Sequence, residues 1–370
     1  MQWLILLVII PYLYFLLKIQ AGLASIKPFH PDEKTEIFIS VIVACRDEER
    51  RLPFLLSDIS GQNYNPDMFE LIIVDDNSSD STFKVATGFS SIKNLKVLKN
   101  NGSGKKKALR TGVEASEGTL IITTDADCRT GKNWLSTIVS FYAGNKPEMI
   151  ICPVKLESGR GFFLRFQELE FLSLQGITAG TSISRNPVMC NGANLAFLKE
   201  SYLRYADSLH DELASGDDVF LLHNIKKEPG RNILWLESDQ ALVTTQNADT
   251  LSSFLRQRAR WISKAGAYKD LFTQVLAIVT FVTISVQLLL ITFGLFFPGL
   301  LWVFAAFFAL KSIPDFLILS NTTGRYEERS LLKWFIPSQL VYPVYVLAIF
   351  LYFLRHKTGE DFSSPSPKGI

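Results

Sequence analysis

The stretch TLIITTDAD, residues 119–127, begins as an apolar run and ends in two aspartates. Opened by Glu117-Gly118, such a run predicts a buried strand. Because strand side chains alternate, we expect Asp125 and Asp127 to project to one side, at the carboxyl end where open α/β sheets bind ligands. Carboxylates there suit Mg²⁺ or Mn²⁺ held on a diphosphate. A polar turn that closes a strand gives the same letters, so the pair alone leaves both interpretations open.

Strand and helix patterns alternate on both sides of this stretch. Further strands are predicted at residues 37–44, 69–74, 95–98 and 149–152. Helices are predicted at residues 48–60, 79–89, 105–115 and 134–142. This alternation predicts an α/β domain with a mainly parallel, Rossmann-like sheet. No G-x-G-x-x-G follows the first strand and no G-x-x-x-x-G-K-[ST] occurs, so dinucleotide and P-loop chemistry are not favoured.

The amino end is a membrane candidate. Residues 1–17 are almost continuously apolar, and Lys18 and Lys27 follow them. No basic residue precedes the apolar run and no Ala-x-Ala site closes it, which favours a membrane span over a signal peptide. Since the lysines lie on its carboxyl side, the domain that follows should face the cytoplasm.

The carboxyl third contains three more apolar segments. Residues 272–297 and 300–320 are long enough to span a bilayer, and 334–354 is a third candidate that contains two prolines. The basic loop 321–333 should be cytoplasmic, so a full third span would place the basic residues 355–357 on the opposite side. Either that rule fails locally or the third segment re-enters the membrane.

Two charges occur within the second of these segments. Lys311 and Asp315 lie four residues apart and therefore share one helical face. Charges within hydrocarbon usually pair and face a protein interior. We expect a structural ion pair here, with a contact to lipid headgroups as the alternative.

Composition and spacing define the expected organisation. We expect an amino-terminal span at 1–20, a cytoplasmic catalytic domain at 37–270, a membrane region at 271–355 and a polar tail at 356–370. The net charge of the 370 residues is +2, which gives no argument for nucleic acid. The four cysteines have no metal-binding or paired spacing and are expected to be free thiols: Cys45, Cys128, Cys152 and Cys190.

Two motifs follow predicted strands of the central domain. VDDNSSD, residues 74–80, offers either a capped turn or carboxylates, Asp75 and Asp76, for the edge of a base or ribose. GKKKALRTG, residues 104–112, begins a predicted helix with lysines, the unfavourable end for the helix dipole. That placement indicates a nearby anion such as phosphate, and a solvated basic face is the alternative.

Two later motifs carry further candidate chemistry. SGDD, residues 215–218, has capping-box spacing, and it also supplies a carboxylate able to accept a proton from a hydroxyl. QRARW, residues 257–261, lies in a helix expected to begin at Asp249 or Thr250, and its Gln257, Arg260 and Trp261 share one face. These side chains offer an amide, a bidentate cation for phosphate and a flat apolar wall. A membrane-surface helix would have a similar composition.

Taken together, the motifs resemble those of the family 2 glycosyltransferases, which are inverting enzymes with the GT-A fold. The resemblance covers residues 38–264, with the motifs in the family's order. Residues 74–80 match V-D-D-x-S-x-D, and residues 104–112 match G-K-x-x-A-L-x-x-G. Asp125-Ala126-Asp127 matches D-x-D, and residues 257–261 match Q-x-x-R-W. Asp217-Asp218 stands where the family usually has Glu-Asp, and residues 191–194 stand at a glycine-containing loop on the acceptor side.

The resemblance implies roles for individual residues. Asp218 would be the catalytic base, with Asp217 beside it, and Asp125 and Asp127 would hold Mg²⁺ or Mn²⁺. The nucleotide sugar would contact Ala44, Glu48, Asp75, Asp76, Lys105, Asp125, Gln257 and Arg260. The acceptor would contact Trp261, Asn191 and Gly192.

The expected protein is a multi-pass hexosyltransferase of the inner (cytoplasmic) membrane. Its donor would be a nucleotide-diphosphate sugar, and its acceptor a lipid-linked or glycan hydroxyl presented from the membrane lipid. Because a polymer channel needs more spans, transfer to a lipid-linked acceptor is favoured over a processive polysaccharide synthase. A catalytically silent membrane partner that binds nucleotide sugars is the alternative outside the enzymes.

Overall fold

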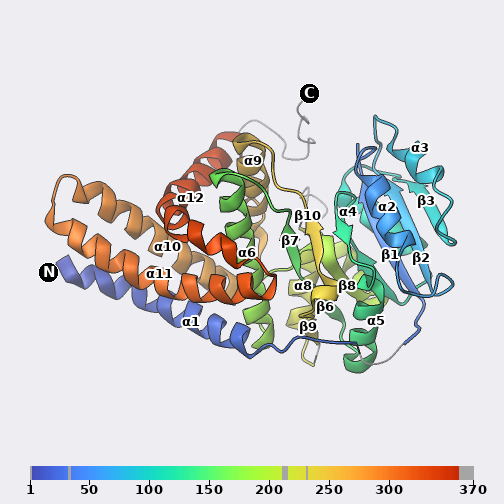
Figure 1. Cartoon of the computed structure of the whole chain (residues 1–370), viewed down its shortest axis with the longest axis horizontal. Coiled ribbons are helices and arrows are strands. Elements are labelled where there is room, and N and C mark those ends of the chain that lie inside the picture. Colours follow the sequence, from blue (N-terminus) through green and yellow to red (C-terminus); the bar gives the residue numbers. More distant parts are fainter. Residues whose placement is uncertain (1, 32–34, 211–215, 231, 358–370) are drawn as a thin grey trace. The chain divides into compact units, whose positions relative to one another are not determined.

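The computed structural model describes residues 2–31, 35–210, 216–230 and 232–357 (Figure 1). The chain forms two compact units. One, here called the sheet unit, comprises residues 27–157 and 189–246. The other, here called the helical unit, comprises residues 1–26, 158–188 and 247–370.

The sheet unit is built on a mainly parallel sheet, which confirms the expected fold class. Within the described residues its strand order is β3-β2-β1-β4-β8-β6-β9. β2 and β4 both pair parallel with β1, whereas β8 runs antiparallel between β4 and β6. The strands span β1 Ile39–Cys45, β2 Phe69–Asp75, β3 Leu95–Lys99, β4 Leu120–Thr123, β6 Met149–Ile151, β8 Leu195–Leu198 and β9 Ile233–Trp235. A second sheet joins β5 Arg129–Thr130, β10 Val243–Thr245 and β7 Val154–Leu156.

Helices connect these strands, and one of them sets the position of a motif. They span α2 Leu52–Ser60, α3 Thr82–Thr87, α4 Lys105–Ala115, α5 Trp134–Asn145, α7 Lys199–Tyr205 and α8 Asp217–Lys227. α4 packs closely on β1 and β2, because Gly112 leaves no side chain at the contact. A Cβ at Gly112 would lie 2.5 Å from Cγ2 of Ile42. The glycine that ends the 104–112 motif is therefore a packing requirement.

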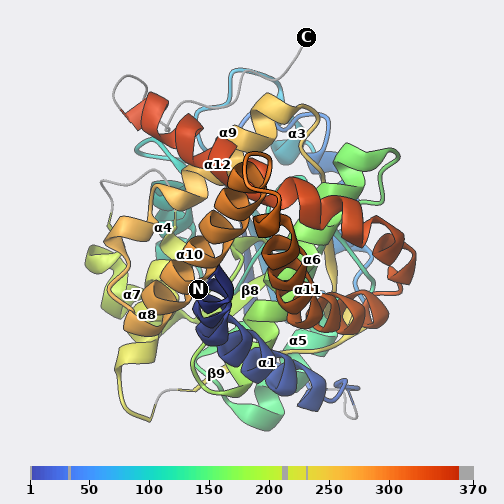
Figure 2. The same cartoon turned by 90° about the vertical axis from the view of Figure 1, so that its left-hand side faces the viewer.

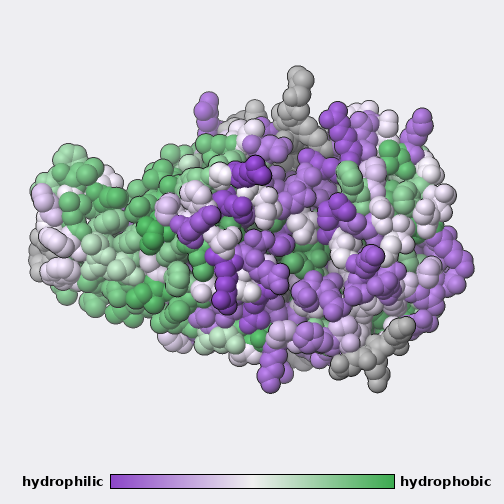
Figure 3. Space-filling view, viewed as in Figure 1, coloured by the Kyte–Doolittle hydropathy of each residue, from purple (hydrophilic) through white to green (hydrophobic). Residues whose placement is uncertain are grey.

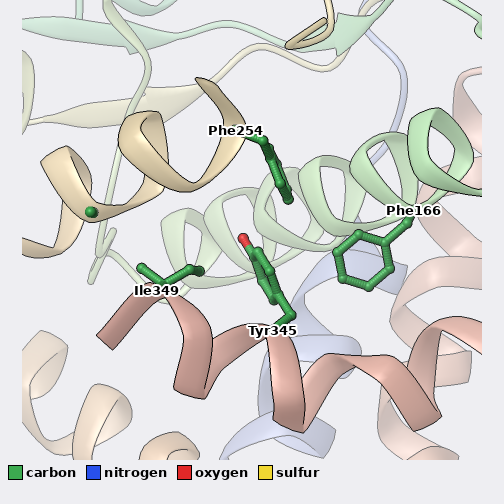
Figure 4. Packing of buried hydrophobic residues seen from close by; sticks show 5 residues of the cluster. Phe166, Phe254, Tyr345 and Ile349 are labelled. Carbon is green, nitrogen blue, oxygen red and sulfur yellow. The ribbon is translucent and has the colours of Figure 1, made fainter. Parts of the chain in front are cut away.

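The helical unit gathers long helices from three parts of the chain (Figures 1 and 2). They span α1 Ile10–Ser25, α6 Phe162–Ile183, α9 Leu251–Ile262, α10 Leu271–Gly294, α11 Gly299–Arg325 and α12 Phe335–Lys357. α6, from the middle of the chain, packs against both α1 and α11. Phe166 of α6, Phe254 of α9 and Tyr345 of α12 form a buried aromatic cluster with Ala259 and Ile349 (Figure 4).

Within the described residues, four segments are long and apolar enough to cross a membrane. They are Trp3–Ser25, Leu271–Gly294, Gly299–Arg325 and Arg329–Arg355. Hydrophobic side chains cover the exposed surface of α1, α10 and α11 (Figure 3). The last segment contains one continuous helix, α12, with Pro343 inside it. These features indicate a membrane protein.

Candidate functional site

A pocket at the carboxyl ends of β1 and β4 brings together several of the predicted residues. α4, α8 and the short 3-10 helix η2, Gly192–Asn194, complete its walls. The predicted site residues that line it are Ala44, Lys105, Asp125, Gly192, Asp217 and Asp218. Residues from four separate motifs thus converge at the edge of the sheet where α/β proteins bind ligands.

The two aspartates after β2 have different surroundings. Both carboxylate oxygens of Asp76 accept the backbone N–H of Gly104, at 2.9 and 3.0 Å, and one also accepts from Asn100 at 2.7 Å. Gly104 has a φ of +98°, a backbone conformation that favours glycine. Asp76 therefore holds the loop that begins α4.

Asp75, in contrast, retains an acceptor for a ligand. Its Oδ2 accepts the N–H of Ser78 at 3.3 Å. Its Oδ1 is buried and has no hydrogen-bond partner among the described residues. Because a buried acceptor without a donor is costly, this atom fits a donor group of a bound nucleoside.

The D-x-D pair lies in a turn just beyond β4. β4 ends at Thr123, and the N–H of Cys128 donates to the carbonyl of Asp125 at 3.1 Å. The expected extended geometry is therefore wrong, since a hydrogen-bonded turn carries both carboxylates. The Asp125 carboxylate accepts a hydrogen bond from the ammonium group of Lys105.

Electrostatics at the pair follow from its neighbours. Burial, then Asp125 and Glu48, raise the pKa of Asp127 to about 6. Desolvation by itself lowers the pKa of Lys105, but Asp125 and Asp217 raise it above the ordinary lysine value. Lys105 is thus a fixed positive charge among carboxylates, although its side chain is 45% exposed.

The donor set at the D-x-D turn fits a divalent cation that also binds phosphate. No group of three or more His, Cys, Asp or Glu side chains within the described ranges could hold a metal by itself. Mg²⁺ usually takes one or two carboxylates and completes its shell with water and substrate phosphates. Asp125 and Asp127 match that requirement, and the pKa of Asp127 is raised first by burial and next by the neighbouring carboxylates of Asp125 and Glu48, whose charge a cation would offset.

Asp218 lies in the first turn of α8, where its carboxylate is oriented from two sides. Oδ2 accepts the N–H of Gly192 at 3.0 Å, and Oδ1 accepts the N–H of Val219 at 2.8 Å. Burial, and next the charge of Asp218, raise the pKa of the buried Asp217. Gly216, with φ +98°, is the N-cap residue, and the predicted capping residue Ser215 lies outside the described residues.

Other residues near the pocket have structural partners. Asn191 accepts the N–H of Ala193 at 3.0 Å and so caps η2. The Glu48 carboxylate lies 3.5 Å from Arg51. Lys106 is buried and donates to the carbonyls of Leu209 and His210, so this lysine of the 104–112 motif is not part of a solvated basic face, whereas Lys105 and Lys107 are exposed.

The four cysteines are free, as expected. Burial, and next Asp75, raise the pKa of the Cys45 thiol to about 12. A thiol with this pKa is protonated at neutral pH, and the thiolate is the form that reacts as a nucleophile. Cys45 is therefore not a nucleophile for this pocket.

The QRARW motif belongs to the helical unit, where α9 begins after Thr250 as expected. Thr250 and Ser253 form a reciprocal capping box. The buried Arg258 binds both oxygens of Glu170 on α6, at 2.9 and 2.5 Å. Arg258 also donates to the side-chain oxygen of Gln257, and its guanidinium lies 4.1 Å from the ring centroid of Trp261.

Sequence reasoning missed Arg258, Glu170 and the α12 residue Tyr345. The Tyr345 hydroxyl donates to Glu170 at 3.0 Å, which completes the buried cluster around Arg258. Arg258 positions two motif residues and is more buried than the exposed Arg260. Its place inside the motif was the available signal, but nothing in one sequence pairs it with a residue 88 positions away.

Comparison with known proteins identifies the segment that supplies most of the residues lining the pocket. Residues 40–205 match the model of the family described as glycosyl transferase family 2. This part of the chain is therefore a glycosyl transferase family 2 domain, which confirms the resemblance drawn from the motifs.

Individual relatives match over limited lengths. Glycosyltransferase AglE of Haloferax volcanii is 28% identical over 184 residues, which are 49% of this chain and 59% of that protein. A dolichyl-phosphate beta-glucosyltransferase of Dictyostelium discoideum is 36% identical over 106 residues, 25% of this chain and 32% of that protein. The chain thus spans less than two thirds of the length of each of these relatives.

A solved structure supports the fold over the whole length. It is a mannosyltransferase from Pyrobaculum calidifontis in complex with GDP-Man and Mn²⁺, with a TM-score of 0.59 and 16% identity. The match covers 96% of this chain and 100% of that one.

The raised pKa of Asp127 predicts a pH-dependent effect of Asp127→Asn. A carboxyl group whose pKa is raised on folding destabilises the folded state at pH values above that pKa, and the penalty disappears as the pH falls below the unfolded value. Without metal, Asp127→Asn should therefore stabilise the protein by about 1–2 kcal/mol at pH 7, with no gain near pH 4. Thermal unfolding in EDTA across this pH range measures the effect.

The thermal unfolding of the parent protein and of Asp127→Asn is then compared again in saturating Mn²⁺ with a nucleoside diphosphate. The parent protein should gain stability from the bound metal and Asp127→Asn should gain less, which reverses their order at pH 7. A variant less stable than the parent at pH 7 in EDTA would contradict this account of the site.

The Glu170–Arg258 pair predicts a large stability effect. Glu170→Gln leaves a buried guanidinium without its counter-charge and should lower the free energy of unfolding by about 3 kcal/mol. The control is Glu200→Gln, which removes a carboxylate that is 81% exposed and pairs with Arg204 at 2.7 Å. That change should cost under about 1 kcal/mol. Equal unfolding midpoints for the two variants would refute the proposed importance of the buried pair.

Proposed function

We propose that this protein is an inverting glycosyltransferase that moves a sugar from a nucleotide-diphosphate sugar to a hydroxyl of a lipid-linked acceptor. The observation that carries the proposal is the pocket that joins Asp125, Lys105 and Asp218. It combines a cation-binding turn, a fixed positive charge and an oriented carboxylate at the ligand-binding edge of the sheet.

The donor would be held at the ends of β1, β2 and β4. The unpartnered Oδ1 of Asp75 supplies an acceptor for the base or ribose, and Ala44 borders the pocket. Asp76 acts through Gly104, since it fixes the loop from which Lys105 extends. Glu48 adds negative charge beside Asp127, in keeping with a site completed by a cation.

Asp125 and Asp127 would hold Mg²⁺ or Mn²⁺ against the donor diphosphate. When bound, the metal neutralises negative charge on the departing nucleoside diphosphate. Its presence with GDP-Man in the Pyrobaculum structure supports a divalent cation in proteins of this fold. Lys105 would turn its ammonium group from Asp125 toward the diphosphate once the metal takes that carboxylate.

Asp218 would accept the proton of the acceptor hydroxyl. The N–H of Gly192 and that of Val219 hold its carboxylate in one orientation. The acceptor oxygen then attacks the anomeric carbon from the face opposite the leaving diphosphate, which inverts that carbon. Asp217, whose pKa is raised by burial, is the residue directly before the base.

The acceptor would be bound with help from the QRARW helix. Arg260 and Gln257 would contact the pyrophosphate of the donor. The acceptor sugar would contact Trp261, Asn191 and Gly192. Membrane-spanning segments and relatives named for lipid-linked chemistry, such as the dolichyl-phosphate beta-glucosyltransferase, support a lipid-linked acceptor. The basic residues after the first span support a catalytic domain on the cytoplasmic face of the inner membrane.

Asp218→Asn tests the base. The change keeps size and hydrogen bonding but removes the proton acceptor, so kcat should fall about 10²–10⁴-fold while nucleotide affinity stays near that of the parent. The control Asp207→Asn alters a carboxylate that is 93% exposed and pairs with Arg110 at 3.1 Å. Transfer and nucleotide binding are measured with purified full-length protein. Wild-type turnover in Asp218→Asn would exclude Asp218 as the base.

A panel of nucleotide sugars with Mg²⁺ or Mn²⁺ and lipid extracts tests the function itself. One sugar added to an extractable lipid is expected. Long polymer formed from donor alone would favour a processive synthase. Binding of nucleotide sugars without hydrolysis or transfer across the panel would favour a silent partner.

A further inference from the structure

The helical unit contains a cavity that the proposed transfer chemistry does not explain. Its volume is about 100 Å³, and helices α1, α6, α10, α11 and α12 contribute to its walls. The polar side chains that line it include Tyr12, Ser173, Thr280, Ser338 and Tyr342. Since one water needs about 10–15 Å³ in the same measure, the space admits a group larger than a single water.

The charges at one wall of the cavity cancel one another. The Lys311 ammonium group donates to Asp315 and to the side-chain oxygen of Gln339, at 2.7 Å in each case. Tyr12 donates to the other carboxylate oxygen of Asp315 at 2.5 Å, and Gln339 donates to Asp315 at 3.0 Å. The expected Lys311–Asp315 ion pair is therefore confirmed, and its groups are engaged with one another.

The charge of Glu170, at a second wall of the cavity, is also compensated. Glu170 borders the cavity, and the buried Arg258 compensates its carboxylate. The described residues that line the cavity thus bring no surplus positive charge. A phosphate group would have to enter without a matching cation, which is unfavourable in a low-dielectric site.

Ser338 gives the cavity wall a hydroxyl group without a hydrogen-bond partner among the described residues. Its side chain is 8% exposed, and the hydroxyl is buried. An unpaired hydroxyl in such surroundings is costly, and a hydroxyl of a ligand would satisfy it. The Tyr342 hydroxyl also lines the cavity, and the Ser173 hydroxyl, which donates to the carbonyl of Glu170 at 2.7 Å, can still accept a hydrogen bond, so the lining favours a ligand that carries several hydroxyl groups.

We infer that this cavity binds the uncharged, hydroxyl-bearing headgroup of a membrane lipid. The surrounding helices are those with membrane-spanning length and composition, so a ligand that reaches the cavity from the bilayer has apolar tails. The headgroup meets Glu170, whose carboxylate holds Arg258 and, through it, Gln257 and Trp261. The inference rests on the proposed function in one respect: only that function makes the bound lipid the acceptor of the sugar.

The test compares two lipids that differ in headgroup charge. The full-length protein is placed in phosphatidylcholine nanodiscs that contain either a diacylglycerol glucoside or phosphatidic acid with the same chains. Bound lipid is measured by native mass spectrometry without donor. The glucoside should bind in preference, and Ser338→Ala should weaken its binding about five-fold through loss of one hydrogen bond.

Ser312→Ala is the matched control. The Ser312 hydroxyl on α11 is likewise buried without a partner among the described residues, but Ser312 does not line the cavity. Its loss should leave glucoside binding unchanged. Preference for phosphatidic acid in the parent protein, or equal effects of the two serine variants, would overturn the inference.

A second variant tests the charge argument independently. Asp315→Asn removes the counter-charge of Lys311 and should shift preference from the glucoside toward phosphatidic acid. Unchanged preference in a variant that retains the parent's unfolding midpoint would count against the site.

The failure of this inference and that of the proposed function give different results. If Ser338→Ala binds the glucoside as the parent does while sugar transfer to lipid proceeds, the cavity assignment fails and the function stands. If the glucoside binds as expected but no donor supports transfer, the cavity stands and the proposed function fails.

Discussion

The sheet unit depends on the contact between the Asp76 carboxylate and the backbone N–H of Gly104. This contact ties the end of β2 to the start of α4, so two segments 28 residues apart share one edge of the sheet. Close packing at Gly112 fixes the other end of the same helix against β1 and β2. With α4 held at both ends, Lys105 reaches Asp125, so the D-x-D turn faces a positive charge.

The helical unit follows a different constraint, the compensation of buried charge. Arg258 and Glu170 are nearly inaccessible to solvent, and each would be costly without the other. Their pairing sets the rotation of α9 on α6, and Tyr345 of α12 joins the same carboxylate. As a result, Gln257 and Trp261 are held by a residue between them, so the motif is ordered before any ligand binds. Lys311 and Asp315 apply the same principle deeper among the long helices.

Much of the sheet unit could be predicted from local patterns. The predicted helix at 105–115 agrees with α4, and the predicted strand at 69–74 differs from β2 by one residue. Motif residues such as Asp125 and Asp218 could be placed at one edge because parallel strands bring their carboxyl ends together. The geometry of the D-x-D pair was not predictable, since the strand ends before it and a hydrogen-bonded turn follows. Helix α6 was not predicted either. Its buried face carries Glu168 and Glu170 among apolar residues, so its apolar residues do not follow a simple helical period.

Short-range periodicity and motifs whose residues lie close in the chain were enough to predict the mainly parallel sheet, the apolar segments and the resemblance to family 2 glycosyltransferases. The difference between Asp75, which keeps an acceptor for a ligand, and Asp76, which does not, came only from the tertiary structure. The same is true of the two lysines, since Lys106 is buried whereas Lys105 faces carboxylates. The tertiary structure also decided that Arg258, rather than Arg260, is the buried anchor of its motif. Adjacent residues of one chemical type differ in these ways because their partners come from distant segments, and only folding brings those segments into hydrogen-bonding distance.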